Sequence, residues 1–442
     1  MVLYPLLISI MSIALLYYCT RYFFGHRAGL IGAFIFAFLP IDITNATRLL
    51  PDMPAAFYGS FGITCILFFL NTTTQHRLIP LSGGIIAGVL FGLSWLCKES
   101  IVYYVPFCLA LVVMTIKKDF HRNIVIWIGV AAGSLSVLLV ESIAYYNLTG
   151  DLTFRFHEIE RNYRELENGF FTEGSKFGWD EGSSYTKALL KRLFIVGPET
   201  IFLNSQFLFT PFLGLIASLY AAYSRERSFL IPALWMITLA VMFNFSSSST
   251  SSYTPLVLFN RYLYPVFFPA IILTGGFFDR LLFAKNKEDE NHISAEAVRE
   301  RFFWGAIFAL LFIIITGYQT LNYIRHAKIP QGWAQEGRIL SAILSPSDRI
   351  YTDILNMKSL EFFWKYPKKM EIIDFEGMQP TNDIPAGSYI LTHPGAINWL
   401  EVNAGMWLSK GNVYVKPYFY ENIPPSWKVV WQNSRAILYK VE

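Results

Sequence analysis

The residues with the clearest chemical potential are a few charged side chains placed at the ends of long apolar runs. They are Arg48, Asp52, Lys98, Glu99, Glu141 and Arg261. Ionisable residues in or beside membrane spans are costly and are usually functional. Carboxylates and cations that are distant in the sequence recur at similar positions relative to these runs, so the pattern predicts one polar site at one membrane face.

Such a site suits a lipid substrate with an anionic head group. Lysine and arginine stabilise charge that develops on a phosphate oxygen, and a carboxylate can accept a proton from an attacking hydroxyl. A sugar linked to a lipid phosphate therefore fits, with Asp52 as the catalytic carboxylate. A divalent cation is the cofactor that Asp52 and Glu99 would suit through oxygen ligands, although no spacing demands one.

Each of these residues also has a structural interpretation. Asp52, flanked by two prolines, can start a helix, because a carboxylate there meets the positive end of the helix dipole. Lys98–Glu99 can form an ordinary polar turn, and Arg261 can anchor a helix end by snorkelling. Glu141 can be a lone structural carboxyl. The convergence of all four favours the functional interpretation.

The stretch 146–205 adds another group of polar residues. Its first part contains Arg155, His157, Glu158, Glu160 and Arg161. Spacing such as that of Glu158 and Arg161 predicts an amphipathic helix on the membrane surface. His157 is the one histidine in this stretch, and we assign it as a candidate substrate-binding residue.

The composition identifies the elements that must position these residues. Of 442 residues, 54% are hydrophobic and 15% are charged, against roughly 25% charged in soluble domains. Many apolar stretches approach the length that spans a bilayer, so the chain is predicted to be a polytopic α-helical membrane protein. The ten predicted spans are 3–20, 28–41, 54–70, 79–96, 101–116, 123–145, 206–223, 228–245, 257–275 and 303–321.

The charge of the connections predicts their sides. The stretches 20–27, 71–77, 117–122 and 224–227 are short and basic, and 279–302 is longer and mixed. The positive-inside rule places them in the cytoplasm. The alternate connections, which carry Asp52, Lys98 and the stretch 146–205, then face outward, as does everything after residue 321.

The sequence does not indicate a cysteine metal site or a nucleic-acid-binding site. The four cysteines lie in or beside apolar runs without metal-ligand spacing, so we interpret them as small hydrophobic residues. No basic patch with interleaved aromatic residues points to nucleic acid.

Residues 322–442 differ from the rest, since charges and turn residues return. Short strand-like runs include DRIYTDIL, KMEIIDF, GSYILTH, GNVYVK, WKVVWQ and RAILYKVE, with MKSLEFFWKY as a helical insertion. They predict a C-terminal extracytoplasmic α/β domain, after a transmembrane domain that covers residues 1–321.

Four stretches resemble the polyprenyl-phosphate-dependent glycosyltransferases of the GT-C superfamily, in matching order and spacing. They are LLYYCTRYFFGHRAGLIGAFIFAFLPI, NATRLLPDMPAAFYGSFG, GIIAGVLFGLSWLCKESIVYYVP and FNRYLYPVFFPAIIL. This superfamily includes protein O-mannosyltransferases and aminoarabinose transferases. The resemblance covers about residues 3–275 and implies transfer of a sugar, with inversion, from undecaprenyl or dolichyl phosphate to a protein, glycan or lipid.

The resemblance also implies roles for single residues. Asp52 matches the acidic residue of the family's second outer loop, and Lys98 matches a lysine associated with the donor phosphate. Arg261 and Tyr262 match an arginine–tyrosine pair at the head of a late helix. By position, Arg48, Glu99 and His157 complete the candidate donor-phosphate and substrate-binding set.

One departure from the family is expected. The family's first helix and first outer loop, which carries its best-known catalytic aspartate, have no counterpart in these residues. The charge pattern agrees, because it makes the first span run from outside to inside. Asp42 and Asp52 are the nearest carboxylates that can take over that role.

Two other function classes stay open at this stage. A transporter or flippase for a lipid-linked glycan would place polar residues at mid-membrane depth and often shows internal repeats. A non-catalytic relative of the GT-C enzymes would bind without turnover. The expected location is the inner (plasma) membrane of a prokaryote, with the site on its outward face.

Overall fold

A computed structural model gives the fold of the chain. It describes residues 3–46, 50–72, 78–116, 119–160, 184–247, 253, 255, 256, 258 and 260–283, scattered helical positions between 303 and 321, and 337–345, 347–352, 371–374, 384–392, 423–433 and 436–442. The chain divides into two compact units. One comprises Met1–Asn162 and Leu189–Ile324, and the other Tyr163–Ala188 and Arg325–Glu442. They are called the helical unit and the sheet unit below.

The helical unit contains the predicted membrane spans. Among the described residues, seven helical stretches are long and apolar enough to cross a bilayer: Leu3–Phe24, Asp52–Asn71, Leu78–Cys97, Glu99–Ile116, Phe120–Thr149, Arg227–Phe245 and Asn260–Phe283. They contain α1 (Leu3–Phe24), α4 (Asp52–Asn71), α5 (Leu78–Cys97), η1 (Glu99–Tyr104) with α6 (Val105–Ile116), α7 (Phe120–Thr149), η4 (Arg227–Phe229) with α12 (Leu230–Phe245), and η5 (Asn260–Leu263) with α13 (Tyr264–Phe283). The prediction of a polytopic helical membrane protein is confirmed.

Some of the predicted spans differ from the described helices. The span predicted at 28–41 is two short helices, α2 (His26–Ala37) and α3 (Pro40–Asn45). The helix predicted at 123–145 runs on to Thr149, so the following connection starts at Gly150 rather than at 146. The tenth predicted span, 303–321, lies mostly outside the described residues.

The span predicted at 206–223 is broken near its start. α9 (Tyr185–Lys191), η2 (Arg192–Val196), α10 (Gly197–Phe202) and η3 (Ser205–Phe207) precede the break, and α11 (Thr210–Ser224) follows it at 112°. Leu208 and Phe209 form the corner with φ values of 51° and 53°. Such left-handed conformations are unfavourable for bulky residues, and no periodicity in the sequence announces them.

α13 forms the centre of the helical unit. Fifteen of its 20 residues are buried, as expected for a helix that is apolar on all sides. It packs against α1, α2, α4, α11 and α12. Phe267 contacts Phe207 with ring centroids 3.8 Å apart. This burial fixes the start of α13, and with it the preceding turn η5.

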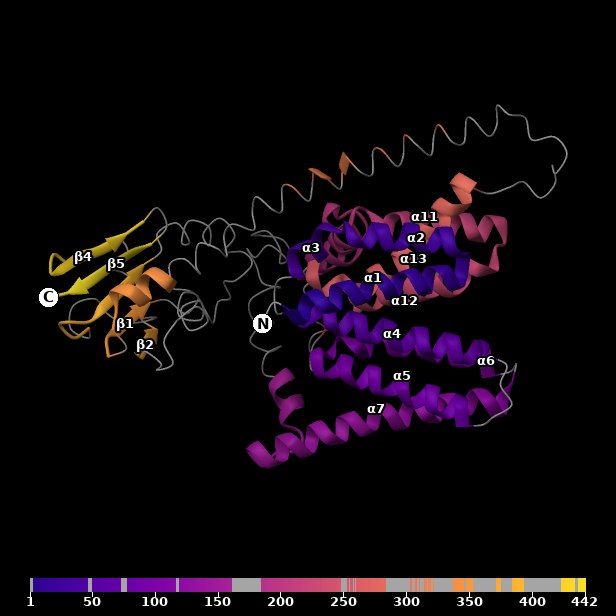
Figure 1. Ribbon diagram of the computed structural model, residues 1–442, viewed down its shortest axis with the longest axis horizontal. Helices are drawn as coiled ribbons and strands as arrows, with labels where there is room; N and C mark the ends of the chain where they lie inside the picture. Colours follow the sequence, from indigo (N-terminus) through magenta and orange to yellow (C-terminus); the bar gives the residue numbers. More distant parts are fainter. Residues whose placement is uncertain are drawn as a thin grey trace. The chain divides into compact units, whose positions relative to one another are not determined.

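α4, α5 and α7 lie side by side in that order (Figure 1). The α5–α7 contact is unusually close because glycines line both helices at four-residue spacing: Gly84 and Gly88 on α5, Gly129 and Gly133 on α7. A Cβ on Gly88 would lie 2.2 Å from the Val130 carbonyl oxygen. Small residues at this spacing let membrane helices approach closely. We call this contact the glycine seam.

The sheet unit has a five-stranded sheet in the order β2-β1-β3-β5-β4. Its strands are β1 (Arg349–Thr352), β2 (Glu371–Asp374), β3 (Tyr389–Thr392), β4 (Trp427–Gln432) and β5 (Ile437–Val441). β1 pairs in parallel with β2 and β3, whereas β5 is antiparallel to β3 and β4. Five of the six predicted strand runs are confirmed. GNVYVK and the insertion MKSLEFFWKY lie outside the described residues.

Candidate active site

Asp52 is the centre of a cluster of charges contributed by three separate parts of the chain. It lies in the first turn of α4, and its side chain is only 3% exposed. Its Oδ1 forms an ion pair with Lys98 Nζ, and its Oδ2 lies 3.7 Å from Arg261 Nε. Asp52 starts a helix, as the structural interpretation expected, but its carboxylate contacts two cations contributed by other segments.

Tyr262 covers the two cations. Lys98 Nζ lies 3.1 Å from the centroid of the Tyr262 ring, and the guanidinium carbon of Arg261 lies 5.4 Å from it. An aromatic face attracts cations in this arrangement. Asp52, Lys98, Arg261 and Tyr262 are called the Asp52 cluster below.

Local hydrogen bonds bring Lys98 to Asp52. The Ser94 hydroxyl of α5 donates to the Ala55 carbonyl of α4 at 2.7 Å. The amide of Lys98 donates to the Ser94 carbonyl at 2.9 Å, and Lys98 itself is extended, between the end of α5 and the start of η1. The end of α5 is thereby held against the first turn of α4.

Arg261 and Tyr262 are placed by the turn η5. Asn204 Nδ2 donates to Asn260 Oδ1 at 2.8 Å, one residue before Arg261. On the other side, the Tyr264 hydroxyl donates to the Ile41 carbonyl at 3.1 Å. These two contacts anchor η5 to the α10–α11 connection and to α3.

Burial has the largest effect on the charge of Lys98. Burial lowers the pKa of Lys98, and the charges of Asp52 and Glu99 oppose that change. Glu99 opens η1 directly beside Lys98. Lys98 is 13% exposed and Arg261 is 41% exposed, so solvent reaches the cluster mainly from the Arg261 side. An incoming anion would meet Arg261 first.

Asp42, the second candidate carboxylate, is a separate buried group on α3. Ser9 of α1 donates a hydrogen bond to its Oδ2 at 2.5 Å. Its Oδ1 has no hydrogen-bond partner among the described residues. Burial raises the pKa of Asp42 to about 7, although the Ser9 hydrogen bond acts in the opposite direction. No contact joins it directly to Asp52 within the described part of the chain.

Glu141 is paired rather than isolated. Arg155 Nη1 lies 2.6 Å from Glu141 Oε1, and Trp95 Nε1 donates to Glu141 Oε2 at 2.7 Å. This group joins the ends of α5 and α7 to the helical turns at 154–160. The interpretation of Glu141 as a lone carboxyl is therefore wrong.

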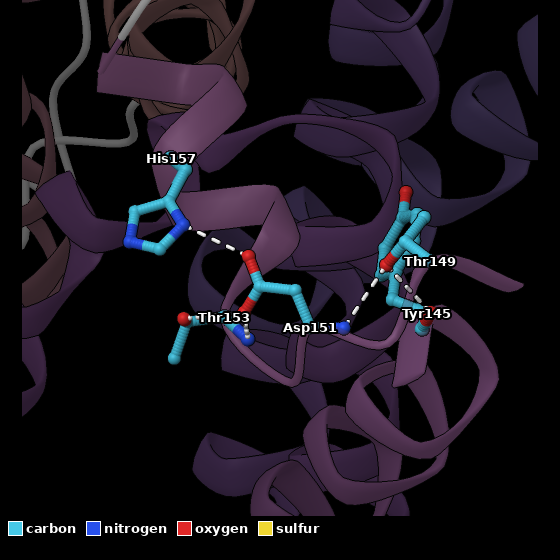
Figure 2. A network of polar contacts seen from close by, with 5 residues as sticks. All are labelled: Tyr145, Thr149, Asp151, Thr153 and His157. Carbon is cyan, nitrogen blue, oxygen red and sulfur yellow. Dashed lines mark hydrogen bonds and ion pairs between the residues drawn. The ribbon is translucent and has the colours of Figure 1, made fainter. Parts of the chain in front are cut away.

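His157 belongs to a local, exposed group of polar contacts. Its Nδ1 lies 2.9 Å from Asp151 Oδ2, while Asp151 Oδ1 accepts from the amide and hydroxyl of Thr153 (Figure 2). Hydrogen bonds from Thr153, with a smaller effect of His157, lower the pKa of Asp151. Within the described residues, the contact of His157 is with Asp151 and not with the Asp52 cluster.

Arg48 and Arg161 lie outside the described residues. Within the described part of the chain, no group of three or more histidine, cysteine or acidic residues could hold a metal ion. All four cysteines are free thiols in the described residues; Cys19 is buried and the other three are partly buried.

An apolar groove begins close to the Asp52 cluster, and the sequence did not predict its lining. Its volume is about 470 Å³, and α5, η1, α6 and α7 line it. The lining includes Phe91, Trp95, Ile101, Tyr104, Trp127 and Leu138. Lys98 directly precedes η1, so the charged cluster and the groove share one turn of backbone. The tryptophan at the end of a span was the available signal, since tryptophans favour membrane interfaces.

Comparison with protein families and solved structures agrees with this picture. Residues 1–143, about a third of the chain, match the family described as dolichyl-phosphate-mannose-protein mannosyltransferase. No curated protein sequence matches the chain.

Solved structures match over nearly the whole length. ArnT from Cupriavidus metallidurans bound to undecaprenyl phosphate is 15% identical with a TM-score of 0.56, covering 98% of this chain and 82% of that one. The apo state of ArnT is 17% identical with a TM-score of 0.56, covering 99% of this chain and 83% of that one. An apo oligosaccharyltransferase from Archaeoglobus fulgidus is 16% identical, with a TM-score of 0.47 over 86% of this chain and 50% of that one. The chain is an integral membrane protein that shares the fold of ArnT, as its resemblance to the GT-C superfamily predicted.

Proposed function

We propose that the chain is a membrane glycosyltransferase that moves a sugar from a polyprenyl phosphate, either undecaprenyl or dolichyl, to a hydroxyl of a protein, glycan or lipid. The observation that carries the proposal is the Asp52 cluster. A buried carboxylate meets a lysine and an arginine from two other segments, beside a groove that suits a lipid chain.

The reaction assigns one role to each member of the cluster. The acceptor oxygen attacks the anomeric carbon and forms the new glycosidic bond. The bond between that carbon and the phosphate oxygen breaks, and its electron pair leaves with the phosphate. Lys98 and Arg261 stabilise the charge on the leaving oxygen, while Asp52 accepts the acceptor's proton. Attack from the face opposite the phosphate inverts the anomeric centre.

Tyr262 and Glu99 support the same step indirectly, through their neighbours Lys98 and Arg261. The Tyr262 ring holds the two cations in place while the phosphate is absent. Glu99 supplies a second carboxylate beside Lys98. Both oxygens of Asp52 face Lys98 and Arg261, so Asp52 and Glu99 do not fit a divalent cation in this arrangement, and no step is assigned to one. Arg48 and His157 remain predicted substrate-binding residues.

The groove suits the donor's isoprenoid chain. Eleven residues separate Trp127 from Leu138 on α7, which corresponds to about 16 Å along the helix axis. That is roughly half of a bilayer's hydrocarbon thickness. The lining is almost entirely apolar, and the end at Trp95 adjoins the Lys98 turn. A phosphate at Lys98 can therefore have its lipid chain in this groove.

Two findings about similar proteins support the donor class. The matched family is named for dolichyl-phosphate-mannose, and ArnT was solved with undecaprenyl phosphate. We further propose that residues 1–321 form the transferase domain and that residues 322–442 form an extracytoplasmic domain. The location is the outward face of a prokaryotic inner membrane.

The proposal is tested with the purified protein in lipid nanodiscs. It is given polyprenyl-phosphate sugars and a mixture of protein, glycan and lipid acceptors, and the release of polyprenyl phosphate is measured together with sugar transfer. Acceptor-dependent release supports the proposal. Donor binding without release indicates a non-catalytic relative. In liposomes, movement of intact donor across the bilayer indicates a transporter.

A pair of variants makes this test specific for the cluster. Lys98→Ala should weaken donor binding by about one to two orders of magnitude, because a charged partner of the phosphate is lost. Glu226→Gln removes the ion pair of Glu226 with Arg280, which lie 2.6 Å apart, and should leave donor binding unchanged. Equal donor binding by both variants would remove Lys98 from the proposed site.

A further inference from the structure

We propose that the Glu141–Arg155 ion pair is a latch that fixes Trp95 at the mouth of the apolar groove, and that Trp95 thereby selects donors by the length of their lipid chain. This inference rests on the proposed function. It assigns specificity to Trp95, Glu141 and Arg155, none of which takes part in the proposed transfer step.

Trp95 is held from several directions at once. Its indole Nε1 donates to Glu141 Oε2 at 2.7 Å, and its carbonyl accepts from Arg155 Nη2 at 2.6 Å. The guanidinium of Arg155 lies over the indole ring, 5.1 Å from its centroid. Phe156 packs on the same ring with centroids 5.5 Å apart. A tryptophan with this many fixed contacts has essentially one orientation.

The ion pair that provides these contacts is itself largely buried. The side chain of Glu141 is 9% exposed and that of Arg155 is 17% exposed, with 2.6 Å between Arg155 Nη1 and Glu141 Oε1. Loss of one partner of a buried pair is costly because the other charge stays desolvated. The residues after α7 are therefore firmly attached to the ends of α5 and α7.

Trp95 lies where the latch can affect a lipid chain. It lines the groove together with Leu138 of α7 and Ile101 of η1, and it comes three residues before Lys98. Because Trp95 lies about one helical turn from Lys98, a chain attached to a phosphate at Lys98 would pass beside the Trp95 ring on its way into the groove. Apolar binding free energy grows with the area buried, so a long chain depends on this passage more than a short chain does.

The test compares two donors with the same sugar phosphate, one with a long polyprenyl chain and one with a short prenyl chain that fills little of the groove. In Glu141→Gln and Arg155→Gln, KM for the long-chain donor should rise on the order of tenfold, while kcat and KM for the short-chain donor stay unchanged. Trp95→Ala should give the same selective change. Glu226→Gln, which breaks an ion pair that does not line the groove, is the control.

Other outcomes overturn the inference. Equal changes for both donors would mean that Arg155 acts on the head group or on folding. Unchanged KM values for both donors would mean that the latch has no role in selection. If a latch variant fails to fold, Trp95→Phe keeps an aromatic ring without the indole N–H, and it should show a smaller shift in the same direction. A variant indistinguishable from the unmodified protein would then count against the latch.

Failure of the proposed function gives a different result. If the unmodified protein transfers sugar from neither donor, the transferase proposal fails. Binding of long-chain and short-chain prenyl phosphates in nanodiscs then tests the latch without any turnover. Loss of the preference for the long chain in Glu141→Gln supports the latch, and an unchanged preference overturns it.

Discussion

Asp52 and Asp151 both stand beside the start of a helical segment, yet their contacts differ in kind. Asp151 bonds to Thr153 and His157, all within six residues, and it is 36% exposed. Asp52 is 3% exposed and pairs with Lys98 and Arg261, which are distant in the sequence. The contacts of Asp151 lie within its own turn, so they need no other element. The contacts of Asp52 come from two other segments, so they require the helices of the unit to pack together. That arrangement is expected of a functional site.

The greatest loss of activity is expected from a change at Asp52. Asp52→Asn should lower sugar transfer by about 10²–10⁴-fold, because a proton acceptor is lost at the reacting hydroxyl. The amide keeps the shape of the side chain, so the protein should remain folded. The measurement is turnover at saturating donor, alongside thermal unfolding in detergent. Full turnover by this variant would remove Asp52 from the mechanism.

A pH series examines Lys98. Burial lowers the pKa of Lys98, so its positive charge is lost at a lower pH than for an exposed lysine. Donor binding should therefore be strong at neutral pH and weaken as pH rises through that lowered pKa, roughly tenfold per pH unit beyond it. Lys98→Arg should keep binding at high pH, since arginine stays charged. Identical pH profiles for lysine and arginine would contradict this.

A smaller effect is expected at Arg261. Its side chain is 41% exposed and its Nε is 3.7 Å from Asp52 Oδ2, so solvent screens it more than Lys98. Arg261→Ala should weaken donor binding by roughly tenfold or less, the range for a partly exposed charge. Donor affinity measured across a salt series should also depend less on salt. A loss larger than that of Lys98→Ala would reverse the assigned ranking.

The smallest effect is expected at Asp151. Asp151→Asn should leave sugar transfer unchanged and only loosen the turns at 151–160, visible as faster amide hydrogen exchange there. Because the pKa of Asp151 is lowered in the folded chain, the contribution of its charge is present at neutral pH. It is lost only as pH falls below the usual aspartate range. A large loss of transfer in this variant would break the comparison and support His157 as a substrate-binding residue.

How much of this was predictable depends on the range of each interaction. The apolar runs predict most spans, since hydropathy is a local property. The ion pair between Asp52 and Lys98 was anticipated only as a shared depth, because distances between helices depend on packing. Leu208 and Phe209 show where prediction from hydropathy fails. Their left-handed backbone breaks a predicted span, and neither residue type signals such a turn.

The residues of the site show the same difference between local properties, which the sequence reveals, and contacts that depend on packing, which it does not. Asp52, Lys98 and Arg261 could be selected because charges beside apolar runs are conspicuous, whereas Tyr262 was indicated by the family resemblance. Trp95 could be noticed only as a tryptophan at the end of a span, since its type does not reveal its neighbours in space. Glu141 was singled out, but its partner Arg155 follows a turn whose direction the sequence does not specify.

The glycine seam has a consequence for how a lipid could enter from the side. Gly84 and Gly88 lie so close to α7 that a methyl group would not fit between the helices, so α5 and α7 form a rigid frame. α6 exposes Val105, Leu109 and Val113 and packs against one side of the groove. Its junction with α5 is the 3₁₀ turn η1, a geometry with weaker hydrogen bonds than an α-helix. A lipid chain that comes from the bilayer side would therefore meet the exposed face of α6, next to the turn that carries Lys98, and not the α5–α7 frame.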